Sequence, residues 1–278
     1  KFAVQLPISD LSGLIIMMNI TLKDWLIIAI VMTAGLTYIA MADEPGSASE
    51  QNQIVSFEST QNQTALLELY TSEGCSSCPP ADRWLSSLLD EDDLWLTFIP
   101  IALHVDYWDY IGWKDPFANA DHSARQRQYA REQSLKTVYT PGFVYNGKEW
   151  RNWYVKRYLD FPKGDRPGVL KLKLDGQQAN LEFTPTEFTR KKLKANLALL
   201  GFNLETDVRA GENRGKKLPH DFVVLGMNQA DLKTDKNQYL SQLDIPTSTI
   251  KTNRYAIVAW INDSDNQMPV QTVGGWLP

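Results

Sequence analysis

The stretch Ala65-Leu66-Leu67-Glu68-Leu69-Tyr70, followed closely by Glu73-Gly74-Cys75-Ser76-Ser77-Cys78-Pro79-Pro80, decides the fold expected for this chain. The first part is an apolar, strand-like run, and the residues after the second part have helical spacing. The chain's two cysteines therefore lie in a tight turn between a strand and a helix. The start of a helix carries unpaired N–H groups and partial positive charge, which stabilise a thiolate over a thiol. The pattern predicts a redox-active C-x-x-C pair in which Cys75 and Cys78 are catalytic.

Two other interpretations of the cysteine pair stay open. One is a purely structural disulfide, although so short a loop removes little entropy from the unfolded chain and stabilises little. The other is a metal site, since the cysteines with His104, and with His122 or His220, supply four ligands of the kind that zinc and copper prefer. The chain has three histidines and no second C-x-x-C. We expect no metal and no cofactor, and keep copper handling as the alternative.

The composition is that of an ordinary globular protein. The 278 residues are 43% hydrophobic and 22% charged, a length that suits two modest domains or one large one. The net charge of −5 and the lack of a long basic stripe argue against a nucleic-acid partner.

The N-terminal part predicts export. Residues 25–41 are almost all apolar, with Lys23 before them and the tripeptide Ala40-Met41-Ala42 at their end. A basic residue, an apolar stretch and a small-x-small tripeptide predict a signal peptide over residues 1–42, cleaved after Ala42. The alternative is an uncleaved membrane anchor, for which residues 25–41 have about the shortest length that can span a membrane. A membrane is an expected partner only in that case. Both place the rest of the chain outside the cytoplasm, periplasmic or secreted, where disulfides persist.

The remaining chain divides into three segments by composition. Residues 43–63 are polar and read as a flexible leader. Residues 64–163 hold the strand, the cysteine turn, a helix, an apolar run over 94–105, an aromatic-rich loop over 106–117 and a polar helix over 119–136. A strand that begins at Thr140-Pro141 and ends in an Asn146-Gly147 hairpin turn follows. Residues 164–278 hold short strand-like runs separated by turns, which predict a β-rich C-terminal domain, either a small sandwich or a sheet.

The loop after the apolar run offers auxiliary residues. His104 and Asp106 alternate at the end of the apolar run, so they could share one face near the cysteines, with His104 carrying protons. A hydrogen-bonded core histidine and a turn-capping aspartate are the structural alternative. Trp108 and the aromatic residues around it could line a groove for an unfolded or peptide client, form a hydrophobic mini-core, or do both. Three arginines of the polar helix are expected to form a solvated face: Arg125, Arg127 and Arg131.

The order of strand, C-x-x-C, helix, buried strand, helix and Thr-Pro strand resembles that of the thioredoxin superfamily. In that family a cis-proline faces the disulfide, and the residue before it offers backbone groups to a bound polypeptide. The resemblance implies that Pro141 is this cis-proline and that Thr140 and Pro141 bind the substrate. It also implies that Cys75 is the nucleophile and Cys78 the resolving cysteine.

More narrowly, the chain resembles, from about residue 66 onward, a family of secreted bacterial thioredoxin-like proteins of unknown function. It departs from familiar thioredoxin motifs because no tryptophan precedes Cys75 and because Ser76-Ser77 stand between the cysteines. The direction of electron flow therefore does not follow from the motif. The resemblance is carried by residues 71–82, by His104-Val105-Asp106-Tyr107-Trp108-Asp109-Tyr110, by residues 112–117, by Arg125-Gln126 and by Gly211-Glu212-Asn213.

These observations together predict an α/β fold, with a thioredoxin-like domain, an aromatic-rich insertion and a mostly β C-terminal segment. The expected function is thiol–disulfide exchange with protein clients and with a redox partner whose identity the sequence does not give. The alternative is a copper- or peptide-binding carrier that uses the same C-x-x-C without catalytic turnover.

Overall fold

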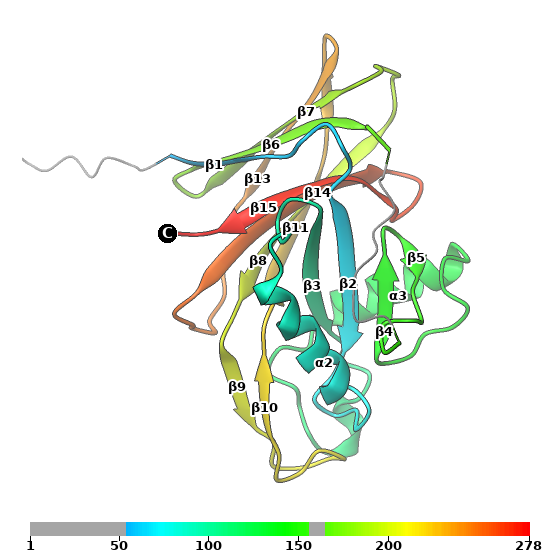
Figure 1. Ribbon diagram of the computed structural model, residues 1–278, viewed down its shortest axis with the longest axis vertical. Helices are drawn as coiled ribbons and strands as arrows, with labels where there is room; N and C mark the ends of the chain where they lie inside the picture. Colours follow the sequence, from blue (N-terminus) through cyan, green and yellow to red (C-terminus); the bar gives the residue numbers. More distant parts are fainter. Residues whose placement is uncertain (1–53, 156–164) are drawn as a thin grey trace, which may run out of the picture. The chain divides into compact units, whose positions relative to one another are not determined.

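The computed structural model describes residues 54–155 and 165–278, which belong to one compact unit, Asn52–Pro278 (Figure 1). The predicted signal peptide, the first part of the predicted leader and the predicted domain boundary at residue 164 lie outside the described residues. None of the helices in the described part of the chain is long and apolar enough to cross a membrane.

The described residues form fifteen strands, two α-helices and two 3-10 helices. The helices are α2 (Pro79–Ser86), η1 (Ser87–Asp90), η2 (Asp109–Ile111) and α3 (Ala120–Arg131). The strands are β1 (Val55–Glu58), β2 (Ala65–Thr71), β3 (Phe98–His104), β4 (Gly142–Tyr145), β5 (Lys148–Glu149), β6 (Gly168–Asp175), β7 (Gln178–Pro185), β8 (Leu193–Gly201), β9 (Leu204–Asp207), β10 (Lys217–His220), β11 (Val223–Asp231), β12 (Lys233–Asp235), β13 (Gln238–Asp244), β14 (Tyr255–Asp263) and β15 (Pro269–Trp276).

An eight-stranded sheet organises this unit, in the order β15-β14-β8-β11-β3-β2-β4-β5. Strand β3 pairs in parallel with β2 on one side and with β11 on the other, and the remaining pairs of this sheet are antiparallel. A second sheet has the order β1-β6-β7-β13-β12, and β9 and β10 form a separate two-stranded ribbon. Figure 1 shows this ribbon reaching the end of β2 where the cysteine turn lies.

Strands β8 and β14 are buried on both faces because a hydrophobic core lies on each side of them. In β14, Ile257, Ala259 and Ile261 face the core shared with the five-stranded sheet. Their neighbours Val258 and Trp260 belong to the core that includes the helices. Alternate side chains of a strand point to opposite faces, so a strand between two cores reads as a continuous apolar run.

Strand β2 positions the cysteine turn and lies between the two α-helices. On one face, the Thr71 hydroxyl donates a hydrogen bond to Asp82 Oδ2 of α2, at 3.1 Å. On the other face, the Glu68 carboxylate is bound by Arg125 of α3, whose Nε lies 2.8 Å from Oε2. The side chains of Thr71 and Glu68, on opposite faces of β2, thus contact different helices. The strand ends at Thr71, where the cysteine turn follows.

The predicted α/β thioredoxin-like fold class is wrong, because the structure is mostly β with two short α-helices. The C-terminal strands are not confined to a separate sheet, because several of them belong to the eight-stranded sheet. Strand β11 pairs with β3 at Val223 and Ala102, and β8, β14 and β15 extend the same sheet beyond it. Apolar runs that looked like strands of a separate segment are the centre of the main sheet, where both faces are buried.

Two local expectations also differ from the structure. Val55–Glu58, within the predicted leader, forms β1 and pairs with β6, and Phe57 of this strand packs closely against Gly275 of β15. The solvated face predicted for the arginines holds for Arg127 and Arg131, which are exposed, but is wrong for Arg125, whose side chain is 3% exposed.

Candidate functional site

The two cysteines form a disulfide at the start of α2. Cys78 is the N-cap residue of α2, and prolines occupy the first two helical positions, where a missing N–H costs little. The N–H of Cys78 donates to the carbonyl of Cys75 at 3.2 Å. Ser76 and Ser77 are exposed at the tip of the turn, whereas Cys75 and Cys78 are 1% and 0% exposed. The sulfurs therefore lie just beneath an accessible tip.

Trp108 packs against the turn and links it to the Thr140–Pro141 peptide. A Cβ at Gly74 would lie 2.8 Å from the Trp108 Cβ, so the tryptophan can approach only because residue 74 is glycine. The indole Nε1 donates to Thr140 Oγ1 at 2.8 Å. The bond between Thr140 and Pro141 is cis, as the resemblance implied.

Pro141 lines a shallow cavity of about 430 Å³. The other lining residues are mostly aromatic or basic: Thr137, Tyr139, Arg151, Trp153 and Tyr154. The Arg151 guanidinium lies 5.5 Å from the centre of the Tyr139 ring.

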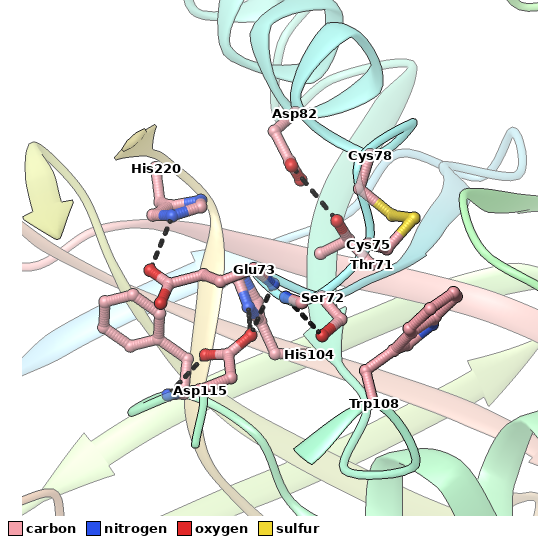
Figure 2. Close-up of polar contacts among 12 residues, drawn as sticks. Thr71, Ser72, Glu73, Cys75, Cys78, Asp82, His104, Trp108, Asp115 and His220 are labelled. Atoms are coloured by element: carbon pink, nitrogen blue, oxygen red, sulfur yellow. Dashed lines mark hydrogen bonds and ion pairs between the residues drawn. A yellow bond between two sulfur atoms is a disulfide. The ribbon is translucent and has the colours of Figure 1, made fainter. Parts of the chain in front are cut away.

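Glu73 fixes the turn from below and is itself 1% exposed. Its N–H donates to Asp115 Oδ2 at 2.9 Å. Its carboxylate accepts a hydrogen bond from Trp113 Nε1 at 2.7 Å and lies 3.0 Å from His220 Nε2. Because its charge is turned toward these partners, Glu73 does not point at the disulfide, as Figure 2 shows.

His104 and Asp106 face different partners. His104 Nδ1 lies 2.7 Å from Asp115 Oδ2, in a pair with no exposed side-chain surface. Burial opposes a charge on the ring, but the neighbouring Asp115 carboxylate raises the pKa of His104. Asp106 instead accepts a hydrogen bond from the Ser123 hydroxyl of α3. The two residues that the sequence suggested might share one face thus serve two separate contacts.

Asp82 lies one helical turn after Cys78, and its N–H donates to the Cys78 carbonyl at 3.1 Å. Its side chain is buried and accepts a hydrogen bond from Thr71. Burial raises the pKa of this carboxyl, and the charges of His220 and His104 act in the opposite direction.

The ribbon β9–β10 brings residues from far along the chain to the turn. Asn213 is fully buried, and its Nδ2 donates to the carbonyls of Glu73 and Cys75 at 2.8 and 2.9 Å. Glu212 Oε2 accepts a hydrogen bond from the Ser76 N–H at 2.9 Å. The site is thus incomplete without the C-terminal half of the chain.

Sequence reasoning missed several members of this site. Asp82 had a local signal, since it follows Cys78 by four residues on one helix. Four others lie in loops and carry no periodic signal: Trp113, Asp115, Glu212 and Asn213. His220, on the ribbon, was considered only as a possible metal ligand. The Gly211-Glu212-Asn213 segment was noted only as part of the family resemblance.

The histidines and cysteines that a metal site would use are engaged elsewhere. His122 Nδ1 lies 2.9 Å from the His104 carbonyl, and burial lowers the pKa of His122 to about 4. Within the part of the chain that the structure describes, no three His, Cys, Asp or Glu side chains are arranged to hold a metal ion.

Two solved structures are similar to this chain in fold. One is a crystal structure of an Agrobacterium tumefaciens protein, with 22% identity and a TM-score of 0.53, covering 79% of this chain and 94% of that one. The other is HBP35 of Porphyromonas gingivalis, with 14% identity and a TM-score of 0.54, covering 79% and 76%. No curated protein matches the sequence significantly. The profile of the family described as "Protein of unknown function (DUF1223)" matches residues 66–262, and the chain belongs to this family.

Proposed function

We propose that this protein carries out thiol–disulfide exchange outside the cytoplasm through Cys75 and Cys78. The observation that carries the proposal is a disulfide between residues three apart in sequence, placed at the start of α2. A loop of this size contributes little to stability, so a structural role explains the bond poorly. A helix start stabilises the thiolate that exchange requires.

The reaction we propose takes Cys75 as the nucleophile and Cys78 as the resolving cysteine, the roles that the resemblance to thioredoxins implied. In the reduced protein the Cys75 thiolate, next to the exposed tip, attacks a client disulfide and releases one client thiolate. Cys78 then loses its proton and attacks the mixed disulfide at Cys75, which releases the second client thiolate and closes the Cys75–Cys78 bond. The Ser77 hydroxyl lies 3.3 Å from Cys75 Sγ, where it can donate to the thiolate.

We propose that a client approaches the cysteine turn from the side of Pro141. The cavity beside Pro141 is lined by aromatic rings and by Arg151, surfaces suited to an extended polypeptide. Trp108 lies between the Thr140–Pro141 segment and the cysteine turn, and its indole donates a hydrogen bond to Thr140. We propose that a client binds along Thr140 and Pro141 and reaches Cys75 as Trp108 moves aside.

A glutathione redox titration of the exported protein, read by thiol trapping, tests the proposal directly. Because the chain has two cysteines, every trapped thiol reports on this pair. We expect a reversible midpoint between roughly −120 and −270 mV, the range of exchange catalysts. A midpoint below about −300 mV, typical of stable structural disulfides, would contradict it.

Two cysteine variants complete the test. Cys78→Ser should accumulate a mixed disulfide with a model client, because the resolving thiol is lost. Cys75→Ser should form none, and unchanged exchange in that variant would refute the assignment of the nucleophile. Mass spectrometry of the exported chain measures whether residues 1–42 are removed, which separates a cleaved signal peptide from an uncleaved anchor.

A further inference from the structure

The loop between β9 and β10, residues 208–216, holds an acidic side chain against the exposed tip of the cysteine turn. Glu212 Oε2 accepts a hydrogen bond from the Ser76 N–H at 2.9 Å. Ser76 follows Cys75 directly in the chain, and both Ser76 and Glu212 are exposed. A molecule that approaches Cys75 from the tip therefore meets a carboxylate that comes from far along the chain.

The loop fixes Glu212 in this place. Its neighbour Asn213 is 0% exposed and donates hydrogen bonds to two carbonyls of the turn. The loop is also closed on itself, because the Gly215 N–H donates to the Val208 carbonyl at 2.8 Å. A side chain on so constrained a backbone has less conformational freedom to lose when it holds one position. The contact between Glu212 and the turn is therefore supported by the structure around it.

Glu212 brings a negative charge to a tip that has no charge of its own. Hydrogen bonds from Ser76 lower the pKa of Glu212, so its carboxylate is ionised near neutral pH. The exposed tip residues, Ser76 and Ser77, are uncharged. Lys216 of the same loop reaches the turn through Asn213, whose Oδ1 lies 2.9 Å from the ammonium. Of the charged side chains that the structure describes in this loop, Glu212 is the one bonded to the turn backbone itself.

Two other charges near the cysteine turn have partners of their own. Arg151, which lines the cavity beside Pro141, pairs with Glu149 at 2.8 Å. The Glu73 carboxylate is buried and held by its own partners below the turn. Glu212 has no ion-pair partner among the residues that the structure describes, so its charge at the tip is not neutralised by a direct contact.

We propose that Glu212 makes the cysteine pair select disulfides by charge, favouring those with positively charged groups beside the sulfurs over those with negatively charged groups. The inference rests on the exchange function proposed above and names the class of disulfide that the site accepts. A fixed charge at a binding site attracts groups of opposite sign and repels groups of the same sign, so it acts on specificity and on the rate of encounter.

The step that Glu212 affects is formation of the mixed disulfide. The Cys75 thiolate attacks one sulfur of the incoming disulfide, a new S–S bond to Cys75 forms as the old one breaks, and the other sulfur leaves as a thiolate that takes a proton from water. The Cys75 sulfur is oxidised and the leaving sulfur is reduced. Any effect of Glu212 on the Cys75 thiolate itself is the same for every disulfide. Its effect on charged groups of the incoming molecule instead changes sign with their charge.

The test measures how fast the full, reduced protein reacts with three small disulfides at low salt, with acid quenching and mass spectrometry. Cystamine is positively charged, oxidised glutathione is negatively charged, and bis(2-hydroxyethyl) disulfide is neutral and serves as the reference. In Glu212→Gln the amide oxygen can still accept the Ser76 N–H, but the charge is gone. Relative to the neutral disulfide, we expect the rate with glutathione disulfide to rise about threefold and the rate with cystamine to fall about threefold.

Salt and a matched variant identify the cause. At about 1 M salt the screening length is about 3 Å, so the differences between wild type and Glu212→Gln should largely disappear. Glu58→Gln removes the same charge from an exposed position on β1, in the second sheet, and should keep the wild-type ratios of rates. Glu212→Lys reverses the charge and should shift both ratios further in the same directions, which keeps the test available if Glu212→Gln does not fold.

The outcomes separate this inference from the function on which it rests. If wild-type protein forms no mixed disulfide with any of the three reagents, the exchange function fails and the charge selection fails with it. If wild-type protein reacts, and the folded Glu212 variants keep its ratios of rates at low salt, charge selection by Glu212 is refuted while exchange stands.

Discussion

Replacing Arg125 with methionine should destabilise the protein severely, because it leaves a carboxylate buried without its cation. The side chains of Arg125 and Glu68 are 3% and 0% exposed. Arg125 donates to Glu68 through Nε at 2.8 Å and through Nη2 at 3.1 Å. Methionine fills much of the same volume but supplies neither charge nor donors.

The magnitude follows from what remains around Glu68. Removing one partner of a buried ion pair costs about 3–5 kcal/mol, since the other charge stays desolvated. Two hydroxyl donors persist, from Tyr70 at 2.8 Å and from Tyr129 at 2.6 Å, so we expect the lower end, about 3 kcal/mol. Against a typical total of about 5–15 kcal/mol, this is a large fraction of the free energy of unfolding.

Two further variants identify the cause. Arg127→Met changes an exposed arginine of the same helix and should alter stability by less than about 0.5 kcal/mol. The double variant Glu68→Gln with Arg125→Met removes the charge together with its partner. It should be more stable than Arg125→Met alone, because no charge is then left uncompensated.

Urea unfolding of the full chain, followed by circular dichroism and tryptophan fluorescence, measures all four proteins. The reasoning is refuted if Arg125→Met unfolds at the same urea concentration as Arg127→Met. It is refuted equally if the double variant is as unstable as Arg125→Met, since the loss would then come from packing and not from the buried charge.

Four further outcomes test other parts of the structure. Asn213→Ala should lower the free energy of unfolding by about 2 kcal/mol or more in urea unfolding, because two buried carbonyls of the turn lose their donor. Gly74→Ala should cost about 1–3 kcal/mol in the same assay, because the new Cβ meets Trp108, and an unchanged midpoint would contradict that contact. The pKa of His122 falls from its usual 6.5 to about 4, so wild-type protein should lose up to about 3 kcal/mol as the pH decreases through this range. His122→Asn should lack that loss, as urea unfolding at pH 7.5 and at several lower pH values would show. Because the pKa of Asp82 is raised, this carboxyl contributes stability at low pH that is lost as the pH rises through its pKa in the folded protein. Asp82→Asn should therefore be more stable than wild type at neutral pH. A thermal midpoint of the variant below that of wild type would count against this.

The polar helix α3 illustrates why burial was misjudged from sequence. Its buried residues are His122, Ser123, Arg125, Gln126 and Tyr129, which carry almost no apolar periodicity. Hydrophobic spacing indicates a buried face only where burial is apolar. Here the buried face is held by paired polar groups, and their partners on β2 are more than fifty residues away in sequence.

The order of the strands in the main sheet was misjudged for a related reason. The alternation over residues 170–174 and the turn at Asp175-Gly176 correctly indicate the strands β6 and β7. Nothing local indicates that β11 lies beside β3, or that β8 and β14 continue the same sheet. Periodicity reports which faces of a strand are buried, whereas the neighbour that buries them is set by long-range packing.

By itself the sequence determined the local chemistry of this protein: a cysteine pair in a turn between β2 and α2, and a Thr140–Pro141 bond expected and found in cis. Turn residues, helix starts and apolar runs act over a few residues, so they can be read directly from the chain. Only the tertiary structure decided that the sheet is mostly antiparallel β, and that Asn213 and His220 complete the turn from 138 to 147 residues away. Those contacts exist because burying polar groups requires partners, and the partners are supplied by whichever segments the packing of the sheet brings to that place.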